Sequence, residues 1–128
     1  MKVDPIIAVN DVQASSAWYQ ALLSCVSIHG GSEFDVLATS EGEILLCLHK
    51  WGEHDHPTLA EAGNPHGNGL ILYFRTNEID DIWAQVKTRS LTIEKEMDLN
   101  PNSGKKEFSV RDLDGYYITI SEYHEFGR

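Results

Sequence analysis

The sequence predicts an α+β protein in which one βαβββ unit occurs twice. Apolar residues recur with helical spacing in two stretches and form short β-prone runs elsewhere. The helix-start pattern Asn10-Asp11-Val12 returns in the second half as Asn77-Glu78-Ile79. The order of elements is therefore the same in both halves. We expect a single domain over residues 1–128, with repeat 1 at about 1–50, a linker loop at 51–68 and repeat 2 at about 69–126.

The first repeat begins with the apolar strand V-D-P-I-I-A-V, which runs into the helix start at Asn10-Asp11. The residues that follow predict a helix, because apolar side chains recur every three or four positions. Its expected buried face consists of Ala14, Ala17, Trp18, Ala21 and Leu22. Three short strands are expected next: C-V-S-I-H, F-D-V-L-A-T and E-I-L-L-C-L-H, the last after the turn at Glu41-Gly42.

The second repeat begins with the strand G-L-I-L-Y-F-R-T, residues 69–76. The next helix is expected to bury Ile79, Ile82, Trp83 and Val86. The runs L-T-I-E, K-E-F-S-V-R and Y-Y-I-T-I-S-E complete the unit, the last after the turn at Asp114-Gly115. Each repeat would thus be a sheet covered on one side by a helix.

Composition excludes several classes of partner. The formal net charge is −10, from 20 acidic and 10 basic residues, whereas nucleic-acid binding requires a basic surface. The longest apolar run, Ile44 to Leu48, is too short to span a membrane, and the first residues do not resemble a secretory signal. Cys25 and Cys47 lack metal-site or redox spacing, so a cytoplasmic location is expected. The acidic charge is compatible with a cationic ligand.

Polar side chains alternate with apolar ones on the last two strands. Glu107 and Ser109 alternate with Phe108 and Val110, so they are expected to line a cavity while the apolar pair faces the helix. Glu107 is the best catalytic candidate, as a general base, and could equally anchor a cation or pair with Arg111 at the surface.

The last strand shows the same alternation. Its polar face, Tyr117, Thr119 and Ser121, is expected to bind a ligand through aromatic contact and hydrogen bonds. The alternative is ordinary cross-strand packing, with the hydroxyl groups reaching water.

A histidine-rich stretch, H-K-W-G-E-H-D-H, follows the first repeat. His49, His54 and His56 could form a transition-metal site, but a solvated polar loop is the simpler interpretation. His49 and Trp51 are expected to contact the ligand.

Two stretches carry a resemblance to a known family. P-I-I-A-V-N-D-V-Q-A-S-S-A-W-Y and E-F-S-V-R-D-L-D-G-Y-Y-I-T-I resemble the vicinal-oxygen-chelate superfamily, with Leu113 where proline is usual. This superfamily includes glyoxalase I, extradiol dioxygenases, fosfomycin-resistance enzymes and bleomycin-binding proteins. The resemblance implies a glyoxalase/bleomycin-resistance-like fold of two half-barrel modules whose concave side holds the ligand. It also implies a homodimer.

The resemblance further implies four metal-ligand positions, at Asp4, Leu46, Ile71 and Thr119. One carboxylate, one hydroxyl and two aliphatic side chains do not form a catalytic metal site, which needs about three protein donors. A β-bulge or a slip of one residue would change which side chain faces the cavity. In another register, Asp4, His49 and Glu122 would be the metal ligands.

Two functions follow as expectations. The first is a binder of a small organic ligand, cationic or aromatic, that acts without the family's metal, as in the bleomycin-resistance branch. The alternative is a divalent-metal-dependent lyase, isomerase or dioxygenase of the glyoxalase type.

Overall fold

The computed structural model describes residues 1–53, 56–62 and 67–124. The chain divides into two compact units within the predicted linker: unit 1 is Met1–His66 and unit 2 is Gly67–Arg128. Both units have the order βαβββ, which confirms the predicted α+β class with two modules. Neither sheet closes into a barrel. The expectation that the two repeats form one domain stays a prediction.

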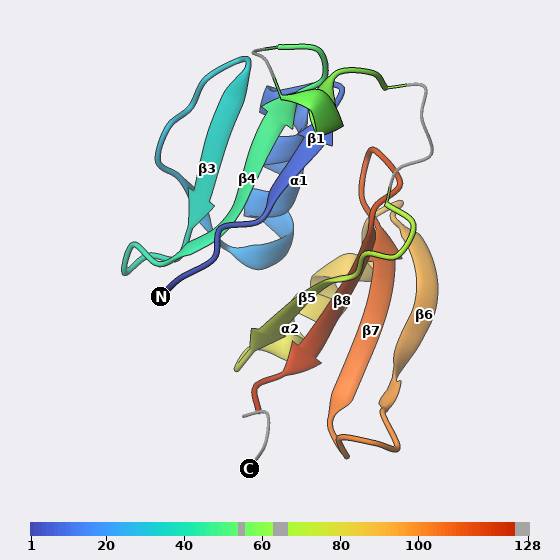
Figure 1. The fold of residues 1–128 in the computed structure, drawn as a ribbon. Coiled ribbons are helices and arrows are strands. Elements are labelled where there is room, and N and C mark those ends of the chain that lie inside the picture. The colour runs from blue at the N-terminus through green and yellow to red at the C-terminus, as the bar shows by residue number, and fades with distance from the viewer. Residues whose placement is uncertain (54–55, 63–66, 125–128) are drawn as a thin grey trace. The chain divides into compact units, whose positions relative to one another are not determined.

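Unit 1 is a four-stranded sheet in the order β1-β4-β3-β2, with α1 covering one face (Figure 1). β1 and β4 are parallel, and the other neighbours are antiparallel. The elements are β1 (Ile6–Val9), α1 (Val12–Leu23), β2 (Val26–Ser27), β3 (Phe34–Ala38), β4 (Ile44–Lys50) and the short 3-10 helix η1 (Pro57–Leu59).

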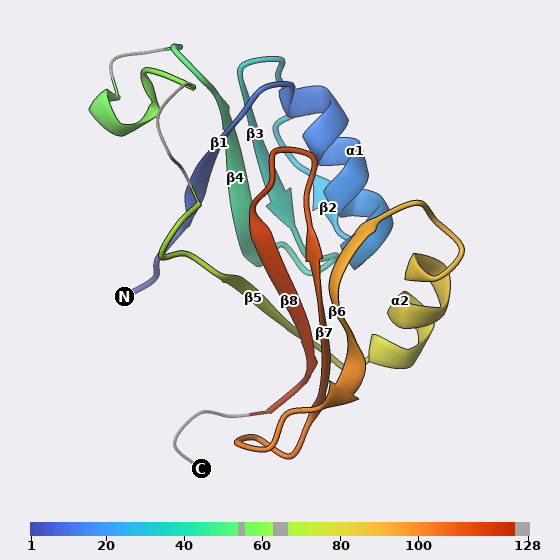
Figure 2. The ribbon, with the colours of Figure 1, turned by 90° about the vertical axis from the view of Figure 1, so that its right-hand side faces the viewer.

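Unit 2 repeats this arrangement in the order β5-β8-β7-β6, with α2 on one face of the sheet (Figure 2). β5 and β8 are parallel, as β1 and β4 are in unit 1. The elements are β5 (Leu72–Thr76), α2 (Ile79–Val86), β6 (Thr92–Leu99), β7 (Lys106–Arg111) and β8 (Tyr117–Glu122).

Both helices begin where the sequence predicts. Asp11 caps α1, because its carboxylate accepts a hydrogen bond from the backbone N–H of Ala14 at 3.0 Å. Glu78 occupies the corresponding position before α2, and its own N–H donates to the hydroxyl of Thr76. Acidic side chains at Asp80 and Asp81 suit the positive end of the α2 dipole.

The predicted buried face of α2 is confirmed, whereas that of α1 is wrong. Ile79, Ile82 and Val86 are buried, and the Trp83 ring lies 4.9 Å from that of Phe108 in β7. In α1, by contrast, the three alanines of the predicted face are exposed and Trp18 is only half-buried. Leu22 is the one residue of the predicted face that is buried, and the other buried residues are Val12, Ser15, Ser16 and Tyr19.

The rotation of α1 has a physical cause in the sheet below it. Ser16 is small and hydrogen-bonds the buried carboxylate of Asp35 in β3. Tyr19, fully buried, supplies the bulk that a row of alanines lacks. Hydrophobicity alone cannot distinguish these faces, because alanine tolerates both water and the core.

A β-bulge in unit 1 shifts one residue of β4. Leu37 pairs with Leu46, but the next residue, Ala38, pairs with Ile44, which leaves Leu45 as an extra residue. Leu46 therefore shares the α1-facing side with Leu37, and Cys47 faces the opposite side. The expectation that Leu46 occupies a ligand-facing position is wrong for this reason.

Candidate functional site

Each sheet has one face covered by its helix and one face that is not. We call the second the helix-free face. In unit 1 it carries Ile6, Phe34, Cys47 and His49, because strand pairing places Ile6 beside Cys47 and Phe34 beside His49. The equivalent pairs in unit 2 are Tyr73 with Thr119 and Glu107 with Ser121. The helix-free faces of the two units differ in character.

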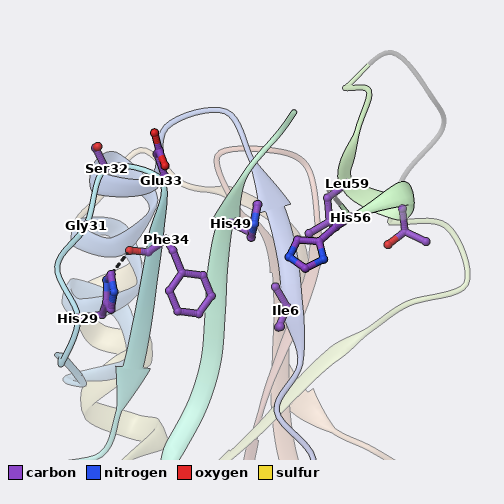
Figure 3. Close-up of a pocket in the computed structure, with 10 residues that line it drawn as sticks. Ile6, His29, Gly31, Ser32, Glu33, Phe34, His49, His56 and Leu59 are labelled. Carbon is purple, nitrogen blue, oxygen red and sulfur yellow. Dashed lines mark hydrogen bonds between the residues drawn. The ribbon is translucent and has the colours of Figure 1, made fainter. Parts of the chain in front are cut away.

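The helix-free face of unit 1 opens into a pocket of about 660 Å³. This volume lies in the range that holds drug-sized ligands. The pocket is bounded by β1, the loop that enters β3, the end of β4 and the segment around η1 (Figure 3). Its lining residues are Ile6, His29, Gly31, Ser32, Glu33, Phe34, His49, His56, Thr58 and Leu59.

A row of aromatic rings forms the wall of this pocket. Ring centroids are 5.2 Å apart between His29 and Phe34, 6.2 Å between Phe34 and His49, and 5.0 Å between His49 and His56. All three contacts are edge-to-face, a favourable geometry for rings. Figure 3 shows His29 and Phe34 on one side of the space, with Ile6 and His56 on the other.

Two of these imidazoles are oriented by backbone carbonyl groups. Nδ1 of His29 lies 2.9 Å from the carbonyl oxygen of Phe34. Nδ1 of His49, a residue only 3% exposed, lies 2.8 Å from the carbonyl oxygen of Lys50. Both rings are thereby held in place before any ligand arrives.

The loop between β2 and β3, which carries His29, is tied to the sheet by Asp35. This carboxylate accepts hydrogen bonds from the Ser27 hydroxyl at 2.8 Å, the Gly30 N–H at 2.7 Å and the Val36 N–H at 2.8 Å. Burial raises the pKa of Asp35, but these bonds and the one from Ser16 outweigh that effect and leave the pKa below its ordinary value. Asp35 therefore remains ionised.

Gly31 also shapes this loop. A Cβ at this position would lie 2.6 Å from the carbonyl oxygen of Phe34 and 3.1 Å from the His29 ring. Only glycine permits the backbone to approach this closely.

The helix-free face of unit 2 is polar. Glu107, 7% exposed, accepts hydrogen bonds from Tyr73 Oη at 3.4 Å and Asn100 Nδ2 at 3.1 Å, and its carboxylate lies 3.7 Å from Lys95 Nζ. The hydroxyl groups of Ser109 and Thr119 hydrogen-bond each other at 2.8 Å.

Arg111 has a different partner from the one considered in the sequence. Its Nε donates to Glu94 at 3.0 Å, and its guanidinium lies 4.9 Å from the centre of the Tyr117 ring. Ser121, next to Glu107 on this face, donates to the carbonyl oxygen of Glu122. Three basic residues, Arg75, Lys95 and Arg111, lie on or beside this face together with the acids Glu94, Asp98 and Glu107.

The remaining candidates divide clearly. His49 lines the unit 1 pocket, whereas Trp51 does not and instead donates its backbone N–H to the carbonyl oxygen of Val9. Glu122 alternates with Ser121 and so faces away from the polar face, where its carboxylate accepts from the Lys106 N–H at 2.7 Å. His54 lies outside the described residues. His29 and Phe34 are not among the site residues predicted from the sequence, although Gly30-Gly31 beside His29 indicates a tight loop.

The family model of the glyoxalase/bleomycin resistance protein/dioxygenase superfamily matches residues 2–120. The chain belongs to this superfamily. No curated protein sequence matches it significantly.

Solved structures support the fold. A protein from the mobile metagenome of V. Pseudocholerae is 22% identical, with a TM-score of 0.71, and the match covers 98% of this chain and 96% of that one. TioX from Micromonospora sp. ML1 is 15% identical, with a TM-score of 0.71 and coverage of 96% and 100%. A glyoxalase/bleomycin resistance protein/dioxygenase family enzyme from Burkholderia phytofirmans PsJN is 19% identical, with a TM-score of 0.73 and coverage of 94% and 98%.

The residues at the metal positions that the resemblance implies are poor donors for a divalent metal. With the bulge taken into account, Cys47 replaces Leu46, so the set becomes Asp4, Cys47, Ile71 and Thr119. Burial raises the pKa of the Cys47 thiol, and the nearby charge of Asp4 raises it further, which disfavours the thiolate that binds metals. Within the described residues, no group of three or more His, Cys, Asp or Glu side chains is placed to hold a metal ion. No described helix is long and apolar enough to cross a membrane.

Proposed function

We propose that this chain binds a small aromatic ligand in the pocket of unit 1, without the superfamily's metal. The row of rings formed by His29, Phe34, His49 and His56 supports this proposal most directly. Flat faces and edges at fixed separations suit an aromatic ligand, which gains both buried area and ring contacts. Membership of a superfamily that contains bleomycin resistance proteins is consistent with binding as the activity.

We propose the polar face of unit 2, taken by itself, as a second ligand-binding surface. Glu107, Ser109, Tyr117, Thr119 and Ser121 would offer a carboxylate, hydroxyl groups and one ring. Glu107 would act as a hydrogen-bond acceptor there, and its existing bonds to Tyr73 and Asn100 keep it oriented. Homodimer formation and a cytoplasmic location stay predictions from the sequence.

Binding of benzamide, a neutral aromatic probe, tests the main proposal. Saturation-transfer NMR should show contact with the probe, and Phe34→Ala should weaken binding by about tenfold, because an inner ring of the row is lost. Phe74→Ala is the matched control, since Phe74 is a half-buried phenylalanine on a strand of unit 2. Equal loss in both variants would contradict the assignment of the pocket.

Metal analysis tests the second part of the proposal. Protein purified without an affinity tag or chelator should contain no stoichiometric divalent ion, because the donor set is too poor to retain one. A stoichiometric ion that disappears in Asp4→Ala would refute metal-independent binding and favour the glyoxalase-type alternative.

A further inference from the structure

The lining of the unit 1 pocket indicates the chemical class of its ligand, and this inference rests on the proposed binding function. Hydrogen bonds define which nitrogen carries the proton in two of the pocket's histidines. A carbonyl oxygen can only accept a hydrogen bond, so Nδ1 of His29 must carry the proton that it shares with Phe34. Nδ1 of His49 carries a proton for the same reason, because it donates to the backbone carbonyl oxygen of Lys50. In a neutral ring, Nε2 then holds the lone pair and is an acceptor.

His29 is the residue that can present this lone pair to a ligand. Its side chain is exposed and lines the pocket, and the ring edge with Nδ1 is occupied by the bond to the Phe34 carbonyl. A Cβ at residue 31 would lie 3.1 Å from Cε1 and Nδ1 of the same ring, so Gly31 leaves the ring the space that it occupies. His49, in contrast, is buried and contributes the surface of its ring.

The charges around the pocket also favour a ligand that donates hydrogen bonds. The ten described residues that line the pocket include no lysine or arginine. Glu33 lies at the rim, with its carboxylate directed away from the rings (Figure 3). The ionised carboxylate of Asp35 lies on the other face of β3 and adds negative potential beneath the pocket. An anionic ligand would lose its hydration here without gaining a lysine or arginine partner.

We infer that the pocket selects aromatic ligands that carry hydrogen-bond donors and no negative charge, of the amidine or amino-heteroaromatic class. The ring would stack against or meet the edge of Phe34, and an N–H group would donate to Nε2 of His29. The unit 1 pocket therefore discriminates by the direction of its hydrogen bonds as well as by shape.

Three probes of nearly the same shape test this inference: benzamidine, benzamide and benzoate. Benzamidine is cationic and only donates, benzoate is anionic and only accepts, and benzamide is neutral. Isothermal titration should rank the affinities in the order benzamidine, benzamide, benzoate. The affinity for benzamidine should be at least about tenfold higher than that for benzoate. Benzamidine gains a hydrogen bond to the pocket, whereas benzoate leaves an acceptor unpaired.

The variant His29→Phe tests whether His29 causes the difference in affinity between the probes. This variant keeps a flat ring beside Phe34 but removes the acceptor, so the ratio of benzamidine affinity to benzoate affinity should fall severalfold. His124→Phe, the same substitution in unit 2, is the matched control and should leave the ranking intact. Circular dichroism and thermal unfolding confirm that both variants fold.

The outcomes separate this inference from the proposed function. Binding of benzoate as tight as that of benzamidine refutes the selectivity but leaves aromatic binding in place. The same holds if His124→Phe changes the ranking as much as His29→Phe. Failure of all three probes to bind refutes the proposed function together with the inference.

Discussion

Replacing Asp35 should destabilise unit 1 more than replacing any exposed acid. In Asp35→Ala, four donors lose their acceptor: the hydroxyl groups of Ser16 and Ser27 and the N–H groups of Gly30 and Val36. Each lost hydrogen bond costs about 1 kcal/mol, so we expect a loss of about 4 kcal/mol in the free energy of unfolding. The residue is 2% exposed, so water cannot easily replace the carboxylate.

Urea denaturation followed by circular dichroism measures this loss. The matched control is Asp98→Ala, which removes an exposed aspartate of β6 that bonds only its neighbour's N–H, and it should change stability by less than about 0.5 kcal/mol. A cost below about 1 kcal/mol for Asp35→Ala would refute the view that this carboxylate holds the β2–β3 loop.

The pH dependence of stability provides an independent check on Asp35. Its pKa in the folded protein is lowered from the ordinary value of 3.8. A lowered pKa means that the carboxylate stabilises the fold fully above the unfolded value and loses this effect as the pH falls through the folded value. The stability gap between the wild type and Asp35→Asn should therefore be largest near neutral pH and shrink in acid. A gap that grows on acidification would contradict the sign of the shift.

Three further predictions address the loop, the polar face and the helix. Gly31→Ala should cost about 1–3 kcal/mol and weaken benzamidine binding in titration, because its Cβ collides with a backbone carbonyl; full retention of both would contradict the close approach. A double-mutant cycle of Ser109→Ala and Thr119→Val should give a coupling of about 1 kcal/mol in urea denaturation, and no coupling would mean that their bond contributes nothing. Ser16→Glu should destabilise the fold by more than about 3 kcal/mol, because it places a second carboxylate beside a buried one, whereas Ala17→Glu should change stability by less than about 0.5 kcal/mol. A larger loss for Ala17→Glu in thermal unfolding would mean that the face predicted from the sequence is the buried one.

The comparison of the two helices shows where sequence patterns succeed. Ile79, Ile82 and Val86 are large and apolar, so their spacing identifies the buried face of α2 without further information. The alanines of α1 are small enough for either environment, so their spacing predicted the wrong buried face. The decisive partner is Asp35, which lies on a strand later in the chain and bonds Ser16.

The candidate site shows the same division. Alternation along β7 correctly separated Glu107 from Phe108, because an unbroken strand turns each successive side chain to the opposite face. Counting from the turn failed on β4, because the extra residue at Leu45 reverses the faces of everything that follows it. Residues 44–48 are all apolar, so the local sequence carries little signal for such a bulge.

The order of elements and the family could both be read from the chain, since each depends on residue type and spacing along it. The unit 1 pocket could not. It brings together His29, Phe34, His49 and His56 from three separate segments, and their ring contacts and bonded carbonyl groups exist only once strands β3 and β4 are paired in register. Long-range pairing sets which side chains meet, and this is a property of the tertiary structure.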